Sequence, residues 1–319
     1  MKRIAVLTSG GDAPGMNPAI RAVVRRAIFN GLEVIGIEHG YQGLLDGDFI
    51  PLGVSSVGDV IQRGGTFLHT ARSEEFKTPE GQRKGLMNLH KSDVDGLVVI
   101  GGDGSFKGAL ALSKLGMPTI GVPGTIDNDV AGTEATIGFD TAVNTVIEAV
   151  DKIRDTAYSH DRTTIIEVMG RSAGLIALWS GLAAGAESIL VPERKDDLQQ
   201  VVIHLKDEKR REKRHIIIIV AEGVCSGAEV RNFIMAETGI DPRVTVLGYI
   251  QRGGAPTAAD RVLGCRMGAL AVDLLAAGKS GYMIGQQAGV IKGIPFEEAL
   301  LNRHELPTDL YNLALSLAI

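Results

Sequence analysis

Two loops carry residue types that could bind phosphate and a metal ion. The apolar run Leu97–Ile100 ends in Gly101–Gly104 (Gly-Gly-Asp-Gly), where glycines let backbone amides approach an anion and the next helix would present its positive end. A second apolar run, Thr119–Val122, ends in Pro123–Thr125 and is followed by Asp127–Asp129 (Asp-Asn-Asp). A phosphate cradle that faces a carboxylate cluster has the parts needed for phosphoryl transfer.

Each of these loops also has a simpler interpretation. The Gly101–Gly104 segment alone could be a tight strand-to-helix turn, and the Asp127–Asp129 segment alone could be a solvated turn. The two segments end adjacent predicted strands, and the carboxyl ends of neighbouring parallel strands meet at the edge where ligands bind. Together they therefore favour a phosphate and metal site.

The order of elements predicts the parallel sheet that these loops need. A strand at Arg3–Thr8 and its glycine-rich loop precede a helix at Met16–Asn30, which Gly31 ends, and a strand at Leu32–Ile37 follows. The pattern repeats and predicts an α/β fold with right-handed crossovers. Later strands are expected at Arg162–Met169, Ser188–Val191, His215–Val220 and Val244–Ile250. Helices are expected at Gly81–His90, Phe139–Ala157, Leu175–Leu182, Leu198–Lys213, Thr257–Ala277 and Asp309–Ala318, with a hairpin-like segment before the last of them.

Length and composition limit the possible functions. A chain of 319 residues predicts about two domains. Its net charge of -5 argues against a nucleic-acid partner. The N-terminal apolar run is too short for a signal peptide, and no apolar segment reaches the ~20 residues that span a membrane, so a cytoplasmic protein is expected. Cys225 and Cys265, the only cysteines, are expected to be structural thiols.

Other motifs are weak. The chain has no GxGxxG sequence, which leaves little support for the usual dinucleotide fold. Gly278–Ser280 resembles the end of a P-loop, but Asp273 stands where that motif needs glycine, so Gly278 is expected to end a helix. His160 and His215 have no second ligand at metal-like spacing, which makes zinc improbable.

An ordered set of motifs resembles the bacterial ATP-dependent 6-phosphofructokinase family over essentially the whole chain. Any one motif could arise by chance, but the series in this order could not. The motifs are LTSGGDAPGMN (7–17), RGGTFLHTAR (63–72), VVIGGDGS (98–105), PGTIDND (123–129), TIGFDTA (136–142), DKIRDTA (151–157), EVMGR (167–171), AEG (221–223) and LGxxQRGGxPTxxDR (247–261).

The resemblance implies a fold and a reaction. The fold would be α/β, with two Rossmann-like three-layer domains and mainly parallel sheets. Residues 1–138 plus 251–301 would bind the nucleotide, and residues 139–250 plus 302–319 would bind the sugar phosphate. The enzyme would transfer the γ-phosphoryl of Mg-ATP to the 1-hydroxyl of fructose 6-phosphate, giving fructose 1,6-bisphosphate and ADP in glycolysis.

The resemblance also implies catalytic roles. Asp127 would be the base that faces the 1-hydroxyl, Asp129 would lie beside it, and Thr125 would position the acceptor. Arg72 and Arg171 would neutralise charge on the transferring phosphate. A carboxylate is a weak base at neutral pH, but it suffices if the proton leaves late, because phosphoryl transfer is mostly positioning and charge stabilisation.

On the nucleotide side, the Gly11 N–H would hold the γ-phosphate and Asp103 would lie near Mg²⁺. Family members that use pyrophosphate carry Asp and Lys where this chain has Gly104 and Gly124, so ATP is the expected donor. The implied nucleotide site comprises Gly11, Arg72, Ser73, Phe76, Lys77, Gly102, Asp103, Gly104, Ser105 and Gly108.

On the sugar side, Arg162 and Arg243 would reach in from a neighbouring subunit. Sharing the site in this way makes the oligomer necessary for activity, and the family is homotetrameric. The implied sugar-phosphate site comprises Thr125, Asp127, Asp129, Arg162, Met169, Gly170, Arg171, Glu222, Arg243, Tyr249 and Arg252.

An effector site between subunits is implied as well, where ADP activates and phosphoenolpyruvate inhibits. From the residues alone, the basic run Lys206–Arg214 is most simply a solvated helix end, whereas the resemblance makes it an anion site. The matching residues are Arg21, Arg25, Arg154, Gly185, Glu187, Arg211 and Lys213.

Several positions depart from the family pattern. Tyr249 stands where the family usually has a histidine that contacts the sugar phosphate, and a phenol cannot become cationic. Ser172 and Leu175 replace polar residues next to the sugar site. Glu212 puts a negative charge where a small residue is common.

Three alternatives remain at this stage. A pyrophosphate-dependent kinase is the nearest. NAD kinases and diacylglycerol kinases share a GGDG-type loop but lack the downstream TIDND and QRGG patterns. A regulator that binds nucleotide and sugar phosphate without turnover is the third, although the intact Asp103, Asp127, Asp129 and Arg171 argue against it.

Overall fold

The computed structural model describes residues 1–194, 197–210, 215–301 and 305–318, and it divides into two compact units. The first unit contains Met1–Ile126, Val130–Thr141 and Arg252–His304. The second unit contains Asp127–Asp129, Ala142–Gln251 and Glu305–Ile319. Among the described residues, no helix combines the length and apolar character needed to cross a membrane.

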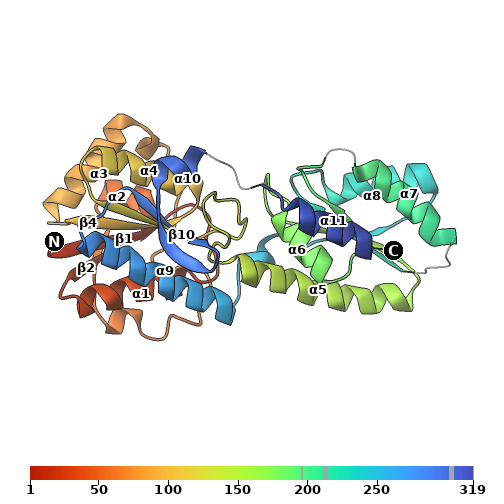
Figure 1. Cartoon of the computed structure of the whole chain (residues 1–319), viewed down its shortest axis with the longest axis horizontal. Helices are drawn as coiled ribbons and strands as arrows, with labels where there is room; N and C mark the ends of the chain where they lie inside the picture. Colours follow the sequence, from red (N-terminus) through yellow and green to blue (C-terminus); the bar gives the residue numbers. More distant parts are fainter. Residues whose placement is uncertain (195–196, 211–214, 302–304, 319) are drawn as a thin grey trace. The chain divides into compact units, whose positions relative to one another are not determined.

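The first unit is built on a seven-stranded sheet in the order β11-β10-β5-β4-β1-β2-β3 (Figure 1). The two edge strands β3 and β11 pair antiparallel, and the five inner strands are parallel. The strands are β1 (Arg3–Thr8), β2 (Glu33–Ile37), β3 (Phe49–Leu52), β4 (Gly96–Gly101), β5 (Thr119–Pro123), β10 (Tyr282–Gln287) and β11 (Val290–Pro295).

Helices cover both faces of this sheet. In Figure 1, α1 and α9 lie together below the sheet, and α2, α3, α4 and α10 lie above it. Thr78 caps α3 by accepting from the Gly81 amide, and Thr257 caps α9 by accepting from the Asp260 amide. The helices are α1 (Met16–Phe29), α2 (Gly40–Asp46), α3 (Pro79–Lys91), α4 (Asp103–Lys114), α9 (Ala258–Ala276) and α10 (Phe296–Leu301).

The second unit has a four-stranded parallel sheet in the order β7-β8-β6-β9. A buried cluster under α7 and α8 includes Val201, Leu205, Val230, Ile234 and Ile218. Its strands are β6 (Thr163–Val168), β7 (Ser188–Leu190), β8 (Ile216–Ala221) and β9 (Arg243–Val246). Its helices are α6 (Leu175–Ala183), α7 (Asp197–Arg210), α8 (Gly227–Thr238) and α11 (Thr308–Leu317), and α5 (Phe139–Ser159) begins in the first unit.

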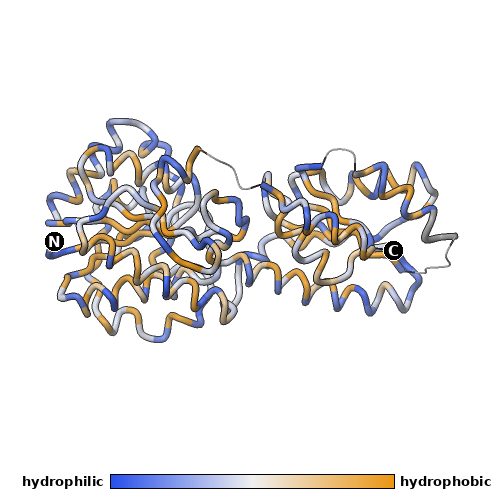
Figure 2. Tube along the Cα trace, in the orientation of Figure 1, coloured by the Kyte–Doolittle hydropathy of each residue, from blue (hydrophilic) through white to orange (hydrophobic). Residues whose placement is uncertain are grey.

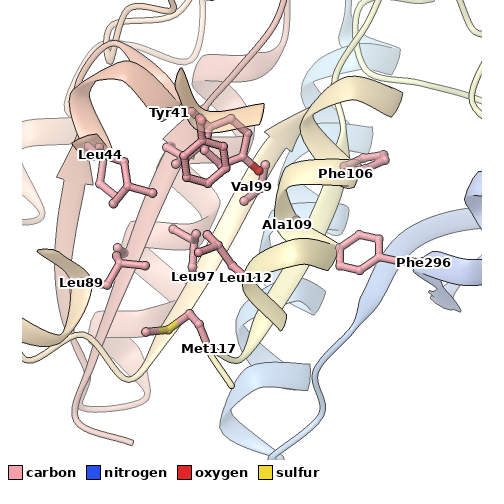
Figure 3. Close-up of a cluster of buried hydrophobic side chains, with 14 of the residues drawn as sticks. Tyr41, Leu44, Leu89, Leu97, Val99, Phe106, Ala109, Leu112, Met117 and Phe296 are labelled. Carbon is pink, nitrogen blue, oxygen red and sulfur yellow. The ribbon is translucent and has the colours of Figure 1, made fainter. Parts of the chain in front are cut away.

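Hydrophobic residues concentrate inside each unit and hydrophilic ones on the outward sides of the helices (Figure 2). In the first unit, one cluster joins β4 residues Leu97 and Val99 to Leu112 of α4 and to Leu44 and Leu89 (Figure 3). β4 is buried along its whole length, as an apolar strand covered on both faces should be.

Most predicted elements are confirmed, and the α/β fold with mainly parallel sheets is confirmed with them. α1 and α9 end just before Gly31 and Gly278, which have positive φ angles as expected of helix-ending glycines. The strand expected at Val244–Ile250 is wrong beyond Val246: Gly248 has φ +52°, and Gly248–Gln251 forms a 3₁₀ helix. The end of the helix expected at Leu198–Lys213 lies outside the described residues.

Candidate functional site

The loop after β1 is fastened to the segment 63–72 in the first unit. The buried side chain of Asn17 donates to the Arg63 carbonyl (3.0 Å) and accepts from the Phe67 amide (2.9 Å). Thr70 donates from Oγ1 to the Gly10 carbonyl (2.9 Å). Because side chains of each segment grip the backbone of the other, the loop of Gly11 and the segment that carries Arg72 form one wall of the site.

The β4–α4 loop presents a helix start. Gly102 is the N-terminal cap in an extended conformation, and Asp103 is the first residue of α4. The buried Ser105 donates from Oγ to the Ser9 carbonyl (3.0 Å), which ties this loop to the one after β1. A Cβ at Gly104 would meet nothing within 4 Å, so open space lies beside this turn.

Asp103 is the residue of this loop suited to hold a divalent cation. It is half-buried, and its Oδ1 atom is shielded from solvent. In the described part of the chain, no group of three or more His, Cys, Asp or Glu side chains could hold a metal ion. Mg²⁺ in kinases is usually held by one or two carboxylates plus substrate phosphates, so a single aspartate at a phosphate-binding helix start fits it.

A buried tyrosine, which the sequence interpretation missed, supports the predicted nucleotide residues Phe76, Ser105 and Gly108. The Tyr41 ring stacks on Phe76, with centroids 4.1 Å apart, and its hydroxyl donates to the Ser105 carbonyl at 2.6 Å. Burial raises the pKa of Tyr41 above its ordinary value. A Cβ at Gly108 would lie 2.6–2.8 Å from the Tyr41 ring, so this helix position needs glycine. No local pattern around Tyr41 predicts this contact.

The remaining predicted nucleotide residues lie nearer the surface. Ser73 is half-buried, and its Oγ accepts from the Phe76 amide (3.3 Å). This hydrogen bond fixes the start of the turn that carries the Phe76 ring. Lys77 is exposed and pairs with Glu74 at 2.6 Å, and Arg72 is exposed.

Arg252 lies against the loop after β1. Its guanidinium is 3.4 Å from the Asp12 carboxylate, and its Nε donates to the Asp12 carbonyl at 3.4 Å. A Cβ at Gly11 would overlap this guanidinium, so Gly11 lets an arginine pack directly on the loop backbone. A residue predicted for the sugar phosphate is thus brought to the glycine predicted for the γ-phosphate.

The loop after β5 is held between two backbones. Gly124 donates to the Gly101 carbonyl of β4, and Thr125 donates to the Ile137 carbonyl (3.1 Å). A Cβ at Gly124 would lie 3.1 Å from the Ile100 and Met16 side chains. Of the two glycines that stand where pyrophosphate-dependent members carry Asp and Lys, Gly104 therefore faces open space and Gly124 is closely packed.

In the second unit, the structure brings Asp127 to Arg171. Asp127 is buried, and its Oδ2 lies 3.5 Å from Nε of the exposed Arg171 side chain. Asn128, which follows Asp127 in the chain, and Arg171 itself both have positive φ angles, which are uncommon and cost energy outside glycine. Asp129 is half-buried beside them in sequence.

The loops after β6 and β8 contact each other at Arg171, the partner of Asp127. Glu222 accepts from the Arg171 amide (2.9 Å), and a Cβ at Gly223 would overlap the Arg171 carbonyl. The Met169 amide donates to the side chain of Gln251, which is fully buried and which no single-residue argument singled out. Gly170, which lies between Met169 and Arg171 in the chain, has φ +137°.

Arg162 and Arg243 lie at the amino ends of β6 and β9, whereas Arg171 follows the carboxyl end of β6. Arg243 begins β9 and pairs in register with Thr164 of β6, and Arg162 immediately precedes β6. Met169 and Arg171 follow the other end of that six-residue strand, which spans about 20 Å. Within one second unit, these arginines therefore cannot join the Asp127–Arg171 pair.

The positions that depart from the family pattern have different surroundings. Tyr249 is exposed in the 3₁₀ helix. Ser172 is exposed, whereas Leu175 is buried as the first residue of α6. Glu212 lies outside the described residues.

The predicted effector residues are distributed over the chain. Arg154 of α5 donates to the carbonyls of Ala184 and Gly185, and the buried Glu187 accepts from the Ile217 amide (2.6 Å). Arg21 and Arg25 lie on α1 of the first unit. Arg211 and Lys213 lie outside the described residues.

Comparisons with known proteins agree on one family. A family model described as phosphofructokinase matches residues 3–275. An ATP-dependent 6-phosphofructokinase of Shouchella clausii is 60% identical, and one of Brevibacillus brevis is 58% identical, each over the full length of both chains. A solved phosphofructokinase of Saccharomyces cerevisiae matches with a TM-score of 0.88 and 35% identity, over 100% of this chain and 48% of that one.

Proposed function

We propose how the site works on the premise that the chain belongs to the phosphofructokinase family. The chain is an ATP-dependent sugar-phosphate kinase of glycolysis, which moves the γ-phosphoryl of ATP to the 1-hydroxyl of fructose 6-phosphate. The single observation that carries the proposed mechanism is the buried Asp127 beside Arg171.

In the proposed reaction, the 1-hydroxyl oxygen attacks the γ-phosphorus, its proton passes to Asp127, and the bond to the ADP oxygen breaks. Arg171, beside Asp127, faces the charge that builds on the phosphoryl oxygens. Asp129 adds negative charge beside the base, Thr125 positions the acceptor, and Arg72 supplies a second positive charge. Such groups act mainly by positioning and charge stabilisation.

On the nucleotide side, we assign the phosphates to the Gly11 amide, the Gly102–Ser105 helix start and Arg72. A kinase of this family needs a divalent metal, and we assign Mg²⁺ to Asp103, where it would neutralise phosphate charge. Phe76 and Gly108, supported by Tyr41, line the base, with Ser73 and Lys77 at the rim. The open side of Gly104 supports ATP over pyrophosphate, because an α-phosphate needs that space.

On the sugar side, we assign Met169, Gly170, Glu222 and Tyr249 to the sugar and Arg252 to its 6-phosphate. Arg162 and Arg243 are assigned to the site of a neighbouring subunit. This assignment is supported by their position at the amino ends of β6 and β9, at the other end of the strands from Arg171. We further propose a homotetramer with active sites shared between subunits.

The regulatory and domain assignments are also proposals. Arg154, Gly185 and Glu187 would form half of an anion site for ADP or phosphoenolpyruvate, completed by Arg21, Arg25, Arg211 and Lys213. The nucleotide domain would take residues 1–138 plus 251–301, and the sugar-phosphate domain the rest. A cytoplasmic location fits a glycolytic kinase.

The test is the initial rate against fructose 6-phosphate with Mg-ATP, with Mg-pyrophosphate, and with Mg-ATP plus phosphoenolpyruvate. Turnover with ATP alone, suppressed by phosphoenolpyruvate, supports the donor and the effector site together. Turnover only with pyrophosphate would overturn the ATP assignment, and binding of both substrates without product would favour the regulator. The Asp127→Ser variant serves as the control for background kinase activity.

A further inference from the structure

Three sequence motifs converge on one buried carboxylate in the first unit, through residues that have no assigned role. Asp260, on the first turn of α9 in the PTxxDR motif, is 1% exposed. Its Oδ1 accepts from the Gly138 amide (2.8 Å), and its Oδ2 accepts from both the amide (2.8 Å) and the hydroxyl of Thr141, in the TIGFDTA motif. Gly15, from the GDAPGMN motif, lies so close that an added Cβ would be 3.3 Å from Asp260 Cβ.

This carboxylate is connected to the loop of Thr125 by a short chain of hydrogen bonds. Next to Gly138, Ile137 donates from its amide to the Pro123 carbonyl (2.9 Å) and accepts from the Thr125 amide (3.1 Å). Thr136 completes the contact by donating from Oγ1 to the Thr125 carbonyl (2.7 Å). Asp260 thus grips one end of the strip 136–138, and that strip holds both sides of the Thr125 peptide.

The location of a charge here is costly in itself. Burial raises the pKa of Asp260, opposed by the hydrogen bonds from Thr141 and Gly138, and nearby Asp140 raises it further. An isolated buried carboxylate is unfavourable unless hydrogen bonds and dipoles compensate it. The first turn of α5 supplies that compensation, because Gly138 and Thr141 offer N–H groups at its positive end.

A second layer fixes the hydroxyl that Asp260 uses. Thr141 Oγ1 accepts from the Thr257 amide (3.0 Å), and Thr257 Oγ1 donates to Asp140. The start of α9 and the start of α5 are therefore locked together through side chains that are themselves hydrogen-bonded. A network in which every member is paired defines one geometry, and losing one member leaves a buried group unsatisfied.

We propose that Asp260 is a positioning residue for phosphoryl transfer: through Gly138 and Ile137 it holds the Thr125 backbone, and with it the acceptor loop that leads to Asp127. The proposal rests on the roles proposed above for Thr125 and Asp127. It assigns Asp260 no contact with substrate. Its effect is on how well the acceptor loop is placed, so it acts on kcat more than on nucleotide affinity.

The test uses the full-length enzyme and two kinds of substitution. Asp260→Asn replaces one acceptor oxygen with a donor that faces the Gly138 or the Thr141 amide, and we expect kcat to fall about 10- to 100-fold with KM for ATP within about twofold. Thr141→Val removes one hydroxyl at constant shape, and we expect a fall of about 10-fold, whereas Thr141→Ser keeps the hydroxyl and stays within about twofold of the parent.

Asp273→Asn is the matched control, because it makes the same change on the same helix. Asp273 pairs with Arg26 near the end of α9 and has no hydrogen bond to the 136–138 strip. We expect it to lower the melting temperature without changing kcat by more than about twofold. If Asp260→Asn does not fold, the Thr141 pair decides the question alone.

Amide hydrogen exchange at Thr125 gives a readout that does not depend on turnover. We expect faster exchange of that amide in Asp260→Asn and Thr141→Val than in Asp273→Asn, because its acceptor is Ile137. Unchanged exchange, or a kcat within twofold of the parent in both variants, overturns the positioning role. A parent enzyme without ATP-dependent turnover overturns the proposed function instead, and the exchange data still test the structural link.

Discussion

The two units place loops at the ends of parallel strands, but they equip these loops differently. In the first unit, the site is mostly backbone: glycines at positions 11, 102 and 104 and the start of α4. In the second unit, it is mostly charged side chains, with Asp127, Arg171 and Glu222 at one sheet edge. Backbone amides suit phosphates of any nucleotide, whereas oriented side chains suit one acceptor. The proposed acceptor site nevertheless also takes Thr125 and Arg252 from the first unit.

A second difference concerns completeness. In the first unit, β1, β4 and β5 bring the loops predicted to bind phosphate together within one chain, through contacts such as the hydrogen bond from Ser105 to the Ser9 carbonyl. In the second unit, the predicted sugar residues lie at both ends of the strands, some before β6 and β9 and others after β6. Parts of one site that lie at opposite ends of a strand cannot meet within one chain, which is why we propose that the sugar site is shared between subunits.

The largest expected effect is on Asp127 itself. Asp127→Ser removes the carboxylate next to Arg171, and we expect kcat to fall about 10²- to 10⁴-fold, the usual range for loss of a general base. Steady-state kinetics at saturating Mg-ATP measure it. A kcat within twofold of the parent would remove Asp127 as the base, and isothermal titration with fructose 6-phosphate separates lost chemistry from lost binding.

The next effect tests whether the second unit serves another chain. Arg243→Ala should raise KM for fructose 6-phosphate about 10- to 100-fold, because a hydrogen bond to a charged group contributes about 1.5–3 kcal/mol. Refolding a mixture of Arg243→Ala and Asp127→Ser subunits should restore part of the low-KM activity, since some hybrid sites then combine a native Asp127 with a native Arg243 from its neighbour.

The matched control replaces the arginine that lies beside Asp127. Mixing Arg171→Ala with Asp127→Ser should restore nothing, because both residues belong to the same second unit and every hybrid site lacks one of them. Recovery with Arg171→Ala, or none with Arg243→Ala, would refute the division of the sugar site between chains.

A smaller effect sharpens the account of the first unit. Gly108→Ala would press on the Tyr41 ring, and we expect a loss of about 1–3 kcal/mol in the free energy of unfolding together with a higher KM for ATP. Gly104→Ala adds a methyl to open space, so the melting temperature should stay the same or rise, while KM for ATP rises if the nucleotide uses that space. Equal melting temperatures for the two variants would contradict the packing argument.

Sequence reasoning predicted the parts of this fold that repeat. The runs at Leu97–Ile100 and Thr119–Val122 became neighbouring strands because apolar strands followed by glycine loops leave few other arrangements in a parallel sheet. The helix-ending glycines 31 and 278 were found because a positive φ angle leaves a local mark in the sequence. α2 and α8 were missed although they end at Gly47 and Gly239, which also have positive φ angles.

The parts that escaped are long-range contacts between unlike residues. Tyr41 supports Ser105 across 64 positions, and Asp260 reaches Gly138 across 122. A tyrosine or an aspartate carries no local sign of its distant partner, so only the folded chain shows these links. The separation of Arg243 from Arg171, by contrast, agrees with the predicted parallel strands, because Arg243 precedes one of them and Arg171 follows the other.

The smallest expected effect, that of Asp95→Asn, tests whether the two units unfold separately. Asp95 accepts from the Lys2 and Arg3 amides at the start of β1, and these hydrogen bonds, the one from Lys2 foremost, lower the pKa of its carboxyl. A carboxyl whose folded pKa lies below its unfolded value stabilises the protein above the ordinary carboxyl range and loses that effect as the pH falls through the folded value. Because Asp95 is largely solvated, Asp95→Asn should cost less than about 1 kcal/mol at pH 7 and progressively less below about pH 4.

Trp179, the only tryptophan, lies on α6, so its fluorescence follows the second unit while far-UV circular dichroism follows both. If the units unfold independently, Asp95→Asn lowers the circular dichroism midpoint and leaves the Trp179 midpoint in place; a common shift of both would show that β1 stabilises the whole chain as one cooperative structure.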